Sequence, residues 1–307
     1  MQRRKDSRPT VVGKRWGLAA TGVGTALLLS GCGEDFTRGF MPEPVTEVGP
    51  TVIGFWNATW IAALVIGVLV WGLILWSVFA YRRRSDKDLP TQFRYHVPLE
   101  ILYTVVPIFM VAALFGKTIE VQNDMLAREE NPDVVVNVVG KKWSWDFNYV
   151  NEDVYVTGTQ ANGLNEGEPG LRETLPTMVL PVDSRVEFVL TSRDVIHSFW
   201  VPQFLQKLDM VPGRVNIFQV TTTEEGRFDG KCAELCGAYH SEMLFNVEVV
   251  PQAEYDAFVE GLRSSGQTGQ LGQDLDQYEL QLDQQDRLVD PDEGFVRDGD
   301  LTDDDGR

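Results

Sequence analysis

The chain has 307 residues, of which 43% are hydrophobic and 23% are charged, and its formal net charge is -18. This composition is that of a folded protein, and the length allows two domains or one domain with membrane anchors. The acidity argues against nucleic-acid binding, because phosphate contacts need clustered Lys and Arg. With only three Cys and three His, a disulfide-scaffolded secreted protein is excluded.

The first 31 residues have the pattern of an export signal. A basic head precedes an apolar stretch over residues 16–29, and a Ser-Gly pair then leads to Cys32. A basic head, a short apolar run and small residues at the cut are typical of secretory signals. The Cys after Ser-Gly resembles a bacterial lipobox, in which that Cys becomes the lipidated first residue. We predict a lipoprotein signal peptide over residues 1–31 and lipidation at Cys32. A plain signal peptide and an uncleaved helix are the alternatives.

Two longer apolar runs follow. Trp60 to Ala80 has 21 residues without a charge or a proline, enough to span the ~30 Å hydrocarbon core of a bilayer. Val97 to Gly116 is the second run, interrupted by Glu100 and Pro107. We predict a transmembrane hairpin over residues 60–116, with two buried helices of a soluble protein as the alternative.

The charges around this hairpin predict its orientation. The loop at residues 81–96 is basic, whereas residues 32–59 and the residues after about Lys117 are acidic. By the positive-inside rule the loop is cytoplasmic. We therefore expect a bacterial cell-membrane protein whose N-terminal segment, residues 32–59, and C-terminal portion are extracytoplasmic.

Glu100 stands about one turn inside the second apolar run. An acid in a membrane helix is costly and indicates function by default. Near the cytoplasmic face it can instead reach the interface, where it needs no partner. Spacing alone leaves both interpretations open.

The residue pattern changes after residue 117, from long apolar runs to short runs of residues that favour β-strands. Short β-rich runs, punctuated by Gly and Pro, occur at residues 134–139, 143–149, 177–180, 185–190, 215–222 and 244–250. Short strands without intervening helices predict a β-sandwich or barrel. A short helix is expected over residues 253–262. We assign residues 117–261 to this exported domain.

The last 46 residues, 262–307, contain 13 acids and 4 bases, a net charge of -9 that is half of the total. With few apolar residues, this acidic tail is predicted to be disordered. A solvating role and an interaction role both remain open.

Soft metal-binding side chains gather in one segment. Cys232 and Cys236 are four residues apart, His240 is four further on, and Met243 is three beyond it. His197 lies 35 residues upstream, at the end of another predicted strand, and a sandwich can bring it to the same loop. Two thiolates, two imidazoles and one thioether would then form one site.

The softness of these ligands favours copper. Zinc would leave Met243 idle, an iron–sulfur cluster wants more Cys than the chain has, and a mononuclear blue-copper site uses only one Cys. Two Cys with two His suit two coppers bridged by both sulfurs, an arrangement for electron transfer. A Cys232–Cys236 disulfide and a zinc site are the alternatives.

These residues resemble subunit II of the haem–copper cytochrome c oxidases, which carries the dinuclear copper centre CuA. The resemblance covers roughly Trp60 to Pro251. Its further motifs are Asp194-Val-Ile-His197-Ser with Val201-Pro202, Lys207 and Asp209 with Pro212-Gly-Arg214, Trp143-Ser-Trp-Asp-Phe-Asn-Tyr149, and Leu99-Glu-Ile101 with Thr104-Val-Val-Pro107. It implies a membrane-anchored all-β protein, in which a two-helix transmembrane hairpin precedes a cupredoxin-like Greek-key β-barrel.

The resemblance also implies roles for individual residues. Cys232 and Cys236 would bridge the coppers, His197 and His240 would be the terminal imidazoles, and Met243 an axial ligand. Glu234 would give its carbonyl to copper and its carboxylate to a Mg²⁺ shared with subunit I, and Asp209 would lie near that Mg²⁺. Trp143 would receive electrons from cytochrome c, and Glu100 would stand at the entrance of a proton path.

The implied function is electron transfer within a terminal respiratory oxidase. Electrons would pass from cytochrome c, or from a cytochrome c domain of a partner complex, through CuA to haem in subunit I. There oxygen is reduced to water with proton pumping. Lys141-Lys142 before Trp143, and Ser144 where many members have an aromatic residue, depart from the family pattern and could alter docking of the donor.

Three other functions share some of these features. A membrane-anchored copper chaperone or thiol–disulfide assembly factor also carries two Cys four apart, but it lacks His240 and Met243 at this spacing. Relatives in quinol-type oxidases lack the copper ligands. Nitrous-oxide reductase, whose terminal domain has a similar copper loop, needs a large second domain.

Overall fold

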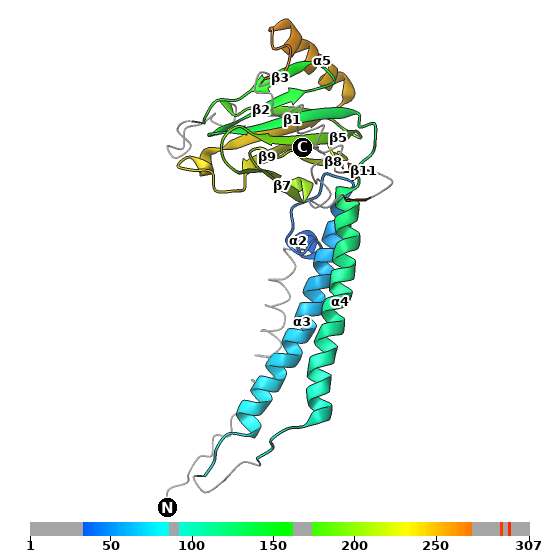
Figure 1. Ribbon diagram of the computed structural model, residues 1–307, viewed down its shortest axis with the longest axis vertical. Helices are drawn as coiled ribbons and strands as arrows, with labels where there is room; N and C mark the ends of the chain where they lie inside the picture. Colours follow the sequence, from blue (N-terminus) through cyan, green and yellow to red (C-terminus); the bar gives the residue numbers. More distant parts are fainter. Residues whose placement is uncertain (1–32, 86–91, 162–173, 272–288, 291–293, 296–307) are drawn as a thin grey trace, which may run out of the picture. The chain divides into compact units, whose positions relative to one another are not determined.

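The computed structural model describes residues 33–85, 92–161, 174–271, 289–290 and 294–295 (Figure 1). Cys32 and the predicted signal peptide lie outside the described residues. The chain divides into two compact units, residues 1–43 and residues 44–307. Within the first unit, the short helix α2 (Gly33–Thr37) is followed by Arg38, which forms an ion pair with Asp35 at 2.7 Å.

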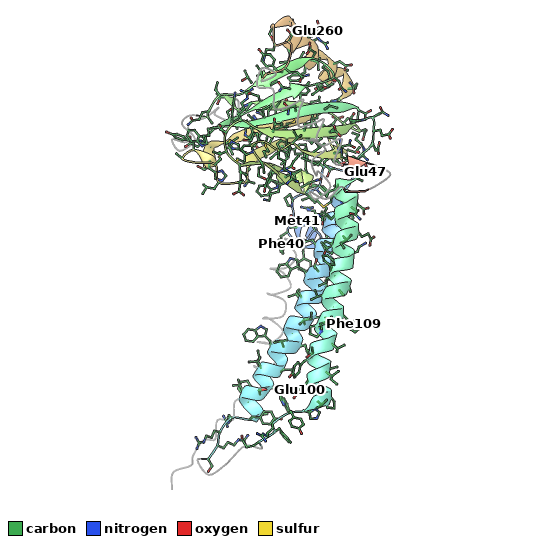
Figure 2. All side chains as sticks on the ribbon, viewed as in Figure 1. Phe40, Met41, Glu47, Glu100, Phe109 and Glu260 are labelled. Atoms are coloured by element: carbon green, nitrogen blue, oxygen red, sulfur yellow. The ribbon has the colours of Figure 1, made fainter. Side chains whose placement is uncertain are left out.

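Two long helices open the second unit. Helix α3 (Gly49–Ala80) has 32 residues and α4 (Val97–Leu126) has 30, and both are long and apolar enough to cross a membrane (Figures 1 and 2). Their side chains are almost all exposed, as expected of surfaces that face lipid. Two membrane-capable helices fit a membrane protein, and they contain the two predicted apolar runs.

Both helices extend beyond the apolar runs. Helix α3 begins at Gly49 rather than Trp60, with a proline in its first turn, where the fixed φ of proline suits a helix start. Helix α4 continues past Gly116 to Leu126, and Lys117 forms an ion pair with Glu120 there at 2.6 Å. The predicted boundaries at 60 and 116 therefore mark the ends of the apolar runs and not the ends of the helices.

Within residues 134–161 and 174–250, which the structure describes, ten strands form the remaining domain. The first sheet has the order β3-β2-β1-β5-β8, with bounds β1 (Val134–Lys141), β2 (Ser144–Tyr149), β3 (Val154–Thr157), β5 (Arg185–Ser192) and β8 (Asn216–Thr221). The second has the order β4-β10-β9-β6-β7, with bounds β4 (Thr177–Pro181), β6 (His197–Val201), β7 (Gln206–Met210), β9 (Gly226–Cys232) and β10 (Leu244–Val250). A 3-10 turn, η3 (Pro202–Phe204), joins β6 to β7.

The two sheets enclose an aromatic core. Trp145 of β2 packs edge-on against Phe245 of β10 with ring centroids 4.9 Å apart, and Phe188 of β5 lies 5.2 Å from Phe199 of β6. All four side chains are at most 1% exposed. The pairs β1·β5 and β4·β10 are parallel and the other ladders of the two sheets are antiparallel. Parallel neighbours that are distant in the chain require crossovers. The two sheets agree with the predicted cupredoxin-like Greek-key β-barrel, here built as a sandwich.

The folded domain ends later than predicted. Helix α5 (Gln252–Ser264) runs through residue 262, whose Leu side chain is 8% exposed. Beyond it, Gln267 exchanges backbone and side-chain hydrogen bonds with Tyr155, and Leu271 N donates to Asn148 Oδ1 at 2.9 Å. The prediction that the acidic tail begins at 262 is therefore wrong, because residues 262–271 pack on the first sheet. Within the tail the structure also describes a two-stranded ladder, β11 (Val289–Asp290) with β12 (Gly294–Phe295).

Candidate metal centre

The predicted ligand segment forms a closed loop between β9 and β10. Cys232 is the last residue of β9, and the 3-10 turn η4 (His240–Glu242) precedes β10. Three backbone hydrogen bonds fix the loop: Cys232 N donates to Met243 O, Met243 N to His240 O, and His240 N to Gly237 O. The loop thus returns on itself, so that four side chains from twelve residues of sequence face one point.

The fifth side chain comes from the neighbouring strand. His197 is the first residue of β6, and the pairing of Phe199 with Cys232 brings it beside the loop. Its ring packs on Gly140, where an added Cβ would lie 3.0 Å from His197 Cδ2. A side chain at residue 140 would therefore push against the imidazole.

The donor atoms converge. Cys232 Sγ lies 3.8 Å from Cys236 Sγ and 3.8 Å from His197 Nδ1. Cys236 Sγ in turn lies 3.6 Å from His240 Nδ1 and 3.8 Å from Met243 Sδ. Both cysteines are free thiols, since a disulfide would place the sulfurs about 2.05 Å apart. The disulfide alternative is therefore wrong for this structure, and each sulfur has an imidazole of its own.

The arrangement fits a copper site. The ligand atoms of His197, Cys232 and Cys236 all lie within 4.8 Å of one another. His197 is fully buried, the two cysteines are 5% and 4% exposed, and Met243 is fully buried. Buried thiolate, imidazole and thioether donors together form a soft ligand set, which favours copper over a harder cation.

The same contacts polarise the ligands. Burial opposes ionisation of Cys232, but hydrogen bonds with His197 and with nearby backbone groups outweigh it and lower the pKa of this thiol. Burial and the negative charge of Cys232 raise the pKa of Cys236. Burial alone would lower the pKa of His197, yet its contacts with Cys232 and Asp194 raise it. Metal ligands must lose their protons, and Cys232 is the sulfur that loses its proton more readily.

Asp194 holds the far side of the His197 ring. Its Oδ1 lies 2.8 Å from His197 Nε2, which leaves Nδ1 facing Cys232. Its Oδ2 accepts a hydrogen bond from Lys142 N at 2.7 Å. A carboxylate on the second nitrogen of a metal-binding histidine fixes its tautomer and orientation. The sequence places Asp194 within a family motif but indicates no role for it, because the local pattern does not show this contact.

Trp143 lies directly against the ligand loop. Its indole Nε1 donates to Cys236 O at 3.3 Å, and its ring meets that of Tyr239 at 4.9 Å between centroids. The ring covers Gly237, which has φ +129°, and a Cβ there would lie 3.1 Å from the indole. Trp143 is half-buried, and Tyr239 is 43% exposed. The sequence analysis did not identify Tyr239 as part of the site. Its position next to His240 in the loop was the signal that could have identified it.

The other predicted residues take separate places. Glu234 is exposed in the loop, and its carbonyl oxygen lies 3.2 Å from Cys232 Sγ. Asp209 is exposed on β7 and pairs with Ser198, whose carbonyl accepts from Ala233 N. Both acids therefore border the ligand loop, and no described contact joins their carboxylates.

Glu100 lies at the start of α4, remote in sequence from the loop (Figure 2). Its Oε1 accepts from His96 N at 2.9 Å, and Leu99 N donates to His96 Nδ1 at 3.3 Å. These two bonds cap the helix start, as capping residues do. The structure thus gives Glu100 a local structural contact in addition to the functional role predicted for it.

Comparison with known proteins places the chain in a family. The profile described as "Cytochrome C oxidase subunit II, periplasmic domain" matches residues 134–250. A probable cytochrome c oxidase subunit 2 of Streptomyces coelicolor is 46% identical over 263 residues, which cover 77% of this chain and 82% of that protein. Cytochrome c oxidase subunit 2 of Mycobacterium tuberculosis is 36% identical over 291 residues, covering 79% and 80%.

A solved structure is also similar. The periplasmic domain of subunit II of cytochrome oxidase of Bradyrhizobium japonicum is 30% identical, with a TM-score of 0.40, and the match covers 44% of this chain and 96% of that one. The ligand loop and its partner strand lie inside the matched family domain. With relatives of this identity matched over four fifths of their own length, the chain belongs to the cytochrome c oxidase subunit 2 family.

Proposed function

We propose that this chain is the electron-transfer subunit of a haem–copper oxidase. It accepts electrons from cytochrome c at a dinuclear copper centre and passes them to haem in subunit I, where oxygen is reduced to water with proton pumping. The observation that carries this proposal is the pair of unlinked sulfurs of Cys232 and Cys236, 3.8 Å apart, each with its own imidazole.

Five side chains and one backbone carbonyl would hold the coppers. Cys232 and Cys236 would supply two thiolates, His197 and His240 one imidazole each, and Met243 and the carbonyl of Glu234 weaker donors. Copper bound here would supply a one-electron couple. The protein supplies a closed loop and buried donor atoms, held between strands β6, β9 and β10. A close-packed site keeps the ligand atoms nearly fixed when an electron is gained or lost.

Trp143 is the residue through which we propose that electrons enter. One side of its ring lies on Gly237 and its N–H binds the carbonyl of Cys236, a bridging ligand in the proposed site. Trp143 is half-buried, so part of its side chain remains accessible to a donor. The donor is cytochrome c or a cytochrome c domain of a partner complex.

The exposed acids that border the loop suggest a second metal. We propose that Glu234 binds a Mg²⁺ at the contact with subunit I and that Asp209 lies near it, because the strand pairing through Ser198 brings both to the same border of the loop. Exposed carboxylates suit a hard cation such as Mg²⁺. Glu100 stands at the entrance of a proton path shared with subunit I.

The membrane arrangement completes the proposal. The charge pattern around α3 and α4 supports a cytoplasmic 81–96 loop and a copper domain on the extracytoplasmic side. Lipidation at Cys32 would add a second anchor at the N-terminus of the mature chain. Haem resides in the partner subunit.

The test is copper content and electron paramagnetic resonance (EPR) of the purified complex. Two coppers per chain sharing one unpaired electron over two nuclei are expected. Cys232→Ser and Cys236→Ser should each abolish that shared signal, while Cys32→Ser should leave it unchanged. One copper, or none together with a redox-active Cys232–Cys236 disulfide, would contradict the proposal and favour an assembly factor.

A further inference from the structure

A buried carboxylate lies beneath the hairpin that carries Trp143. Strands β1 and β2 are joined by the two residues Lys142 and Trp143, since Lys141 pairs with Ser144. Asp146, two residues further along β2, is 0% exposed. A buried charge of this kind must be compensated by partners, because its desolvation is costly.

Two cations and a hydroxyl supply that compensation. Lys141 Nζ lies 2.6 Å from Asp146 Oδ1, and Thr157 Oγ1 donates to the same oxygen at 2.7 Å. Arg193 Nη1 lies 3.3 Å from Asp146 Oδ2. That oxygen has no hydrogen bond within the described residues, so Arg193 is its charge partner. Lys141, Asp146 and Arg193 are called the Asp146 triad below.

The triad joins the hairpin to the segment that leads into His197. Arg193 follows β5, and its backbone N donates to Gly140 O at 3.0 Å. The next residue, Asp194, binds Lys142 N with one oxygen and His197 Nε2 with the other. Both ends of the hairpin turn are therefore fixed to residues 193–197. This is the same segment that orients a copper ligand in the proposed function.

We propose that the Asp146 triad is a positioning unit for electron transfer, which holds Trp143 in register with the copper loop. The inference rests on the proposed function. One electron passes from the donor's haem iron to copper, with no bond made or broken, so the rate depends on how the intervening groups are placed. The triad touches neither copper nor donor, and it acts through the hairpin.

A purely electrostatic role is the competing explanation, because Lys141 and Arg193 are also cations bound to the hairpin that carries Trp143. The hairpin provides a matched control. Lys142 carries the same charge next to Trp143, and its side chain is exposed and makes none of the contacts of the triad. Lys142→Gln removes one positive charge from this surface and leaves Asp146 compensated.

The experiment uses the assembled oxidase and reduced mitochondrial cytochrome c as the probe donor. Stopped-flow reduction of copper, followed over a range of donor concentrations, separates the limiting rate from the half-saturating concentration. Arg193→Gln and Lys141→Gln should lower the limiting rate by roughly tenfold, since sub-ångström misplacement has effects of this order. Copper content and the EPR spectrum should remain those of the unmodified protein.

The conservative variant separates the two explanations. Arg193→Lys keeps the charge but loses the planar fork and length of the guanidinium, so we expect a limiting rate between those of Arg193→Gln and the unmodified protein. Lys142→Gln should change the half-saturating concentration and its salt dependence, and leave the limiting rate unchanged. If Arg193→Gln fails to assemble, Lys141→Gln alone decides.

Two results would overturn the inference. In the first, Arg193→Gln and Lys141→Gln behave as Lys142→Gln does, which would show that the triad contributes only surface charge. In the second, either variant loses copper or alters the EPR spectrum, which would show that the triad supports the metal loop instead of Trp143. Failure of the proposed function would appear separately, as the lack of a shared-electron copper signal in the unmodified complex.

Discussion

The indole Nε1 of Trp143 donates a hydrogen bond to the carbonyl oxygen of Cys236 at 3.3 Å. The two residues are 93 positions apart in sequence, and the contact joins the tip of the β1–β2 hairpin to the middle of the ligand loop. A half-buried aromatic side chain is thus hydrogen-bonded directly to the backbone of a proposed copper ligand.

This connection can be tested by substitution. Trp143→Phe keeps an aromatic ring and removes the N–H donor, so the limiting rate of copper reduction should fall by at least tenfold, a loss consistent with the removal of a positioning contact. Copper content should be unchanged. Tyr239→Phe, which keeps the ring packed on Trp143, is the control and should leave the rate near that of the unmodified protein. An unaltered rate in Trp143→Phe would exclude this residue from the electron path.

Met243 is expected to tune the potential of the site and not to hold the metal. Met243→Leu preserves the volume of a fully buried side chain and removes Sδ, which lies 3.8 Å from Cys236 Sγ. Two coppers should remain bound, and the reduction potential should rise because a weak axial donor is lost. Redox titration of the copper signal measures the shift. Loss of one copper would show that Met243 is an essential ligand.

Asp194 should control copper affinity through His197. Asp194→Asn keeps the size of the side chain but weakens the contact with His197 Nε2 at 2.8 Å. Loss of such a partner costs roughly 10–100-fold in metal affinity. Competition with a copper chelator measures this. Asp256→Asn is the control, because Asp256 is exposed on α5 and bonds only to Gln252 among the hydrogen bonds resolved for it. Equal affinities of the two variants would exclude the role.

The two thiols should differ in reactivity in the metal-free protein. The thiolate is the reactive form. The pKa of Cys232 is lowered and that of Cys236 is raised, so alkylation of Cys232 should be faster at neutral pH. Because a lowered pKa keeps the thiolate as pH falls, Cys232 should also stay reactive further into the acidic range. Peptide mass spectrometry after brief alkylation tests this, and preferential labelling of Cys236 would contradict it.

Tyr149 links the two sheets. Its hydroxyl donates to Val179 O at 3.0 Å and accepts from Val179 N at 2.8 Å, and its side chain is fully buried. Tyr149→Phe leaves both backbone groups of Val179 without this hydrogen-bond partner. It should therefore lower the free energy of unfolding by about 1–3 kcal/mol. Tyr155→Phe is the control, because Tyr155 bonds to Gln267 through its backbone. Denaturant unfolding in detergent measures both, and equal stability would contradict the prediction.

Local patterns predicted most of the architecture. The apolar runs predicted both membrane helices, and β-rich texture predicted β1, β2, β4, β5, β8 and β10 within one or two residues of their ends. Strand β9, Gly226–Cys232, was missed because two Gly and several charged residues have low strand propensity. Pairing with β10 and β6 on its two sides imposes the strand there.

Strand β2 shows a different limit. Its alternation of aromatic and polar residues is typical of a strand with one solvent-exposed face, yet all six residues are buried. The polar face is covered because Asn148 bonds to Asn137 and to Leu271, and Asp146 bonds to Lys141. The sequence pattern indicates which side chains are polar. In the folded domain these polar side chains are buried, and they bond to other protein groups instead of water.

The gathering of these side chains was predictable from the sequence, and their detailed geometry was not. The spacing of Cys232, Cys236, His240 and Met243 indicated one soft site, because a single loop can gather them. The position of His197 depends on the β6–β9 pairing, and the contact between Asp194 and Lys142 joins residues 52 positions apart. Such contacts depend on the register of the sheet, and spacing along the sequence does not determine that register.

The segment after α5 has a consequence for solubility. Residues 267–269 bond to the backbone of Asp153 and Tyr155 and so occupy the outer edge of β3. An uncovered edge strand is a template for pairing with another chain. Truncation after Leu271 should therefore leave a well-behaved protein, whereas truncation after Ser264 would expose that edge and favour intermolecular strand addition. The acidic residues that follow begin where the edge is already closed, and their mutual repulsion adds a second barrier to aggregation.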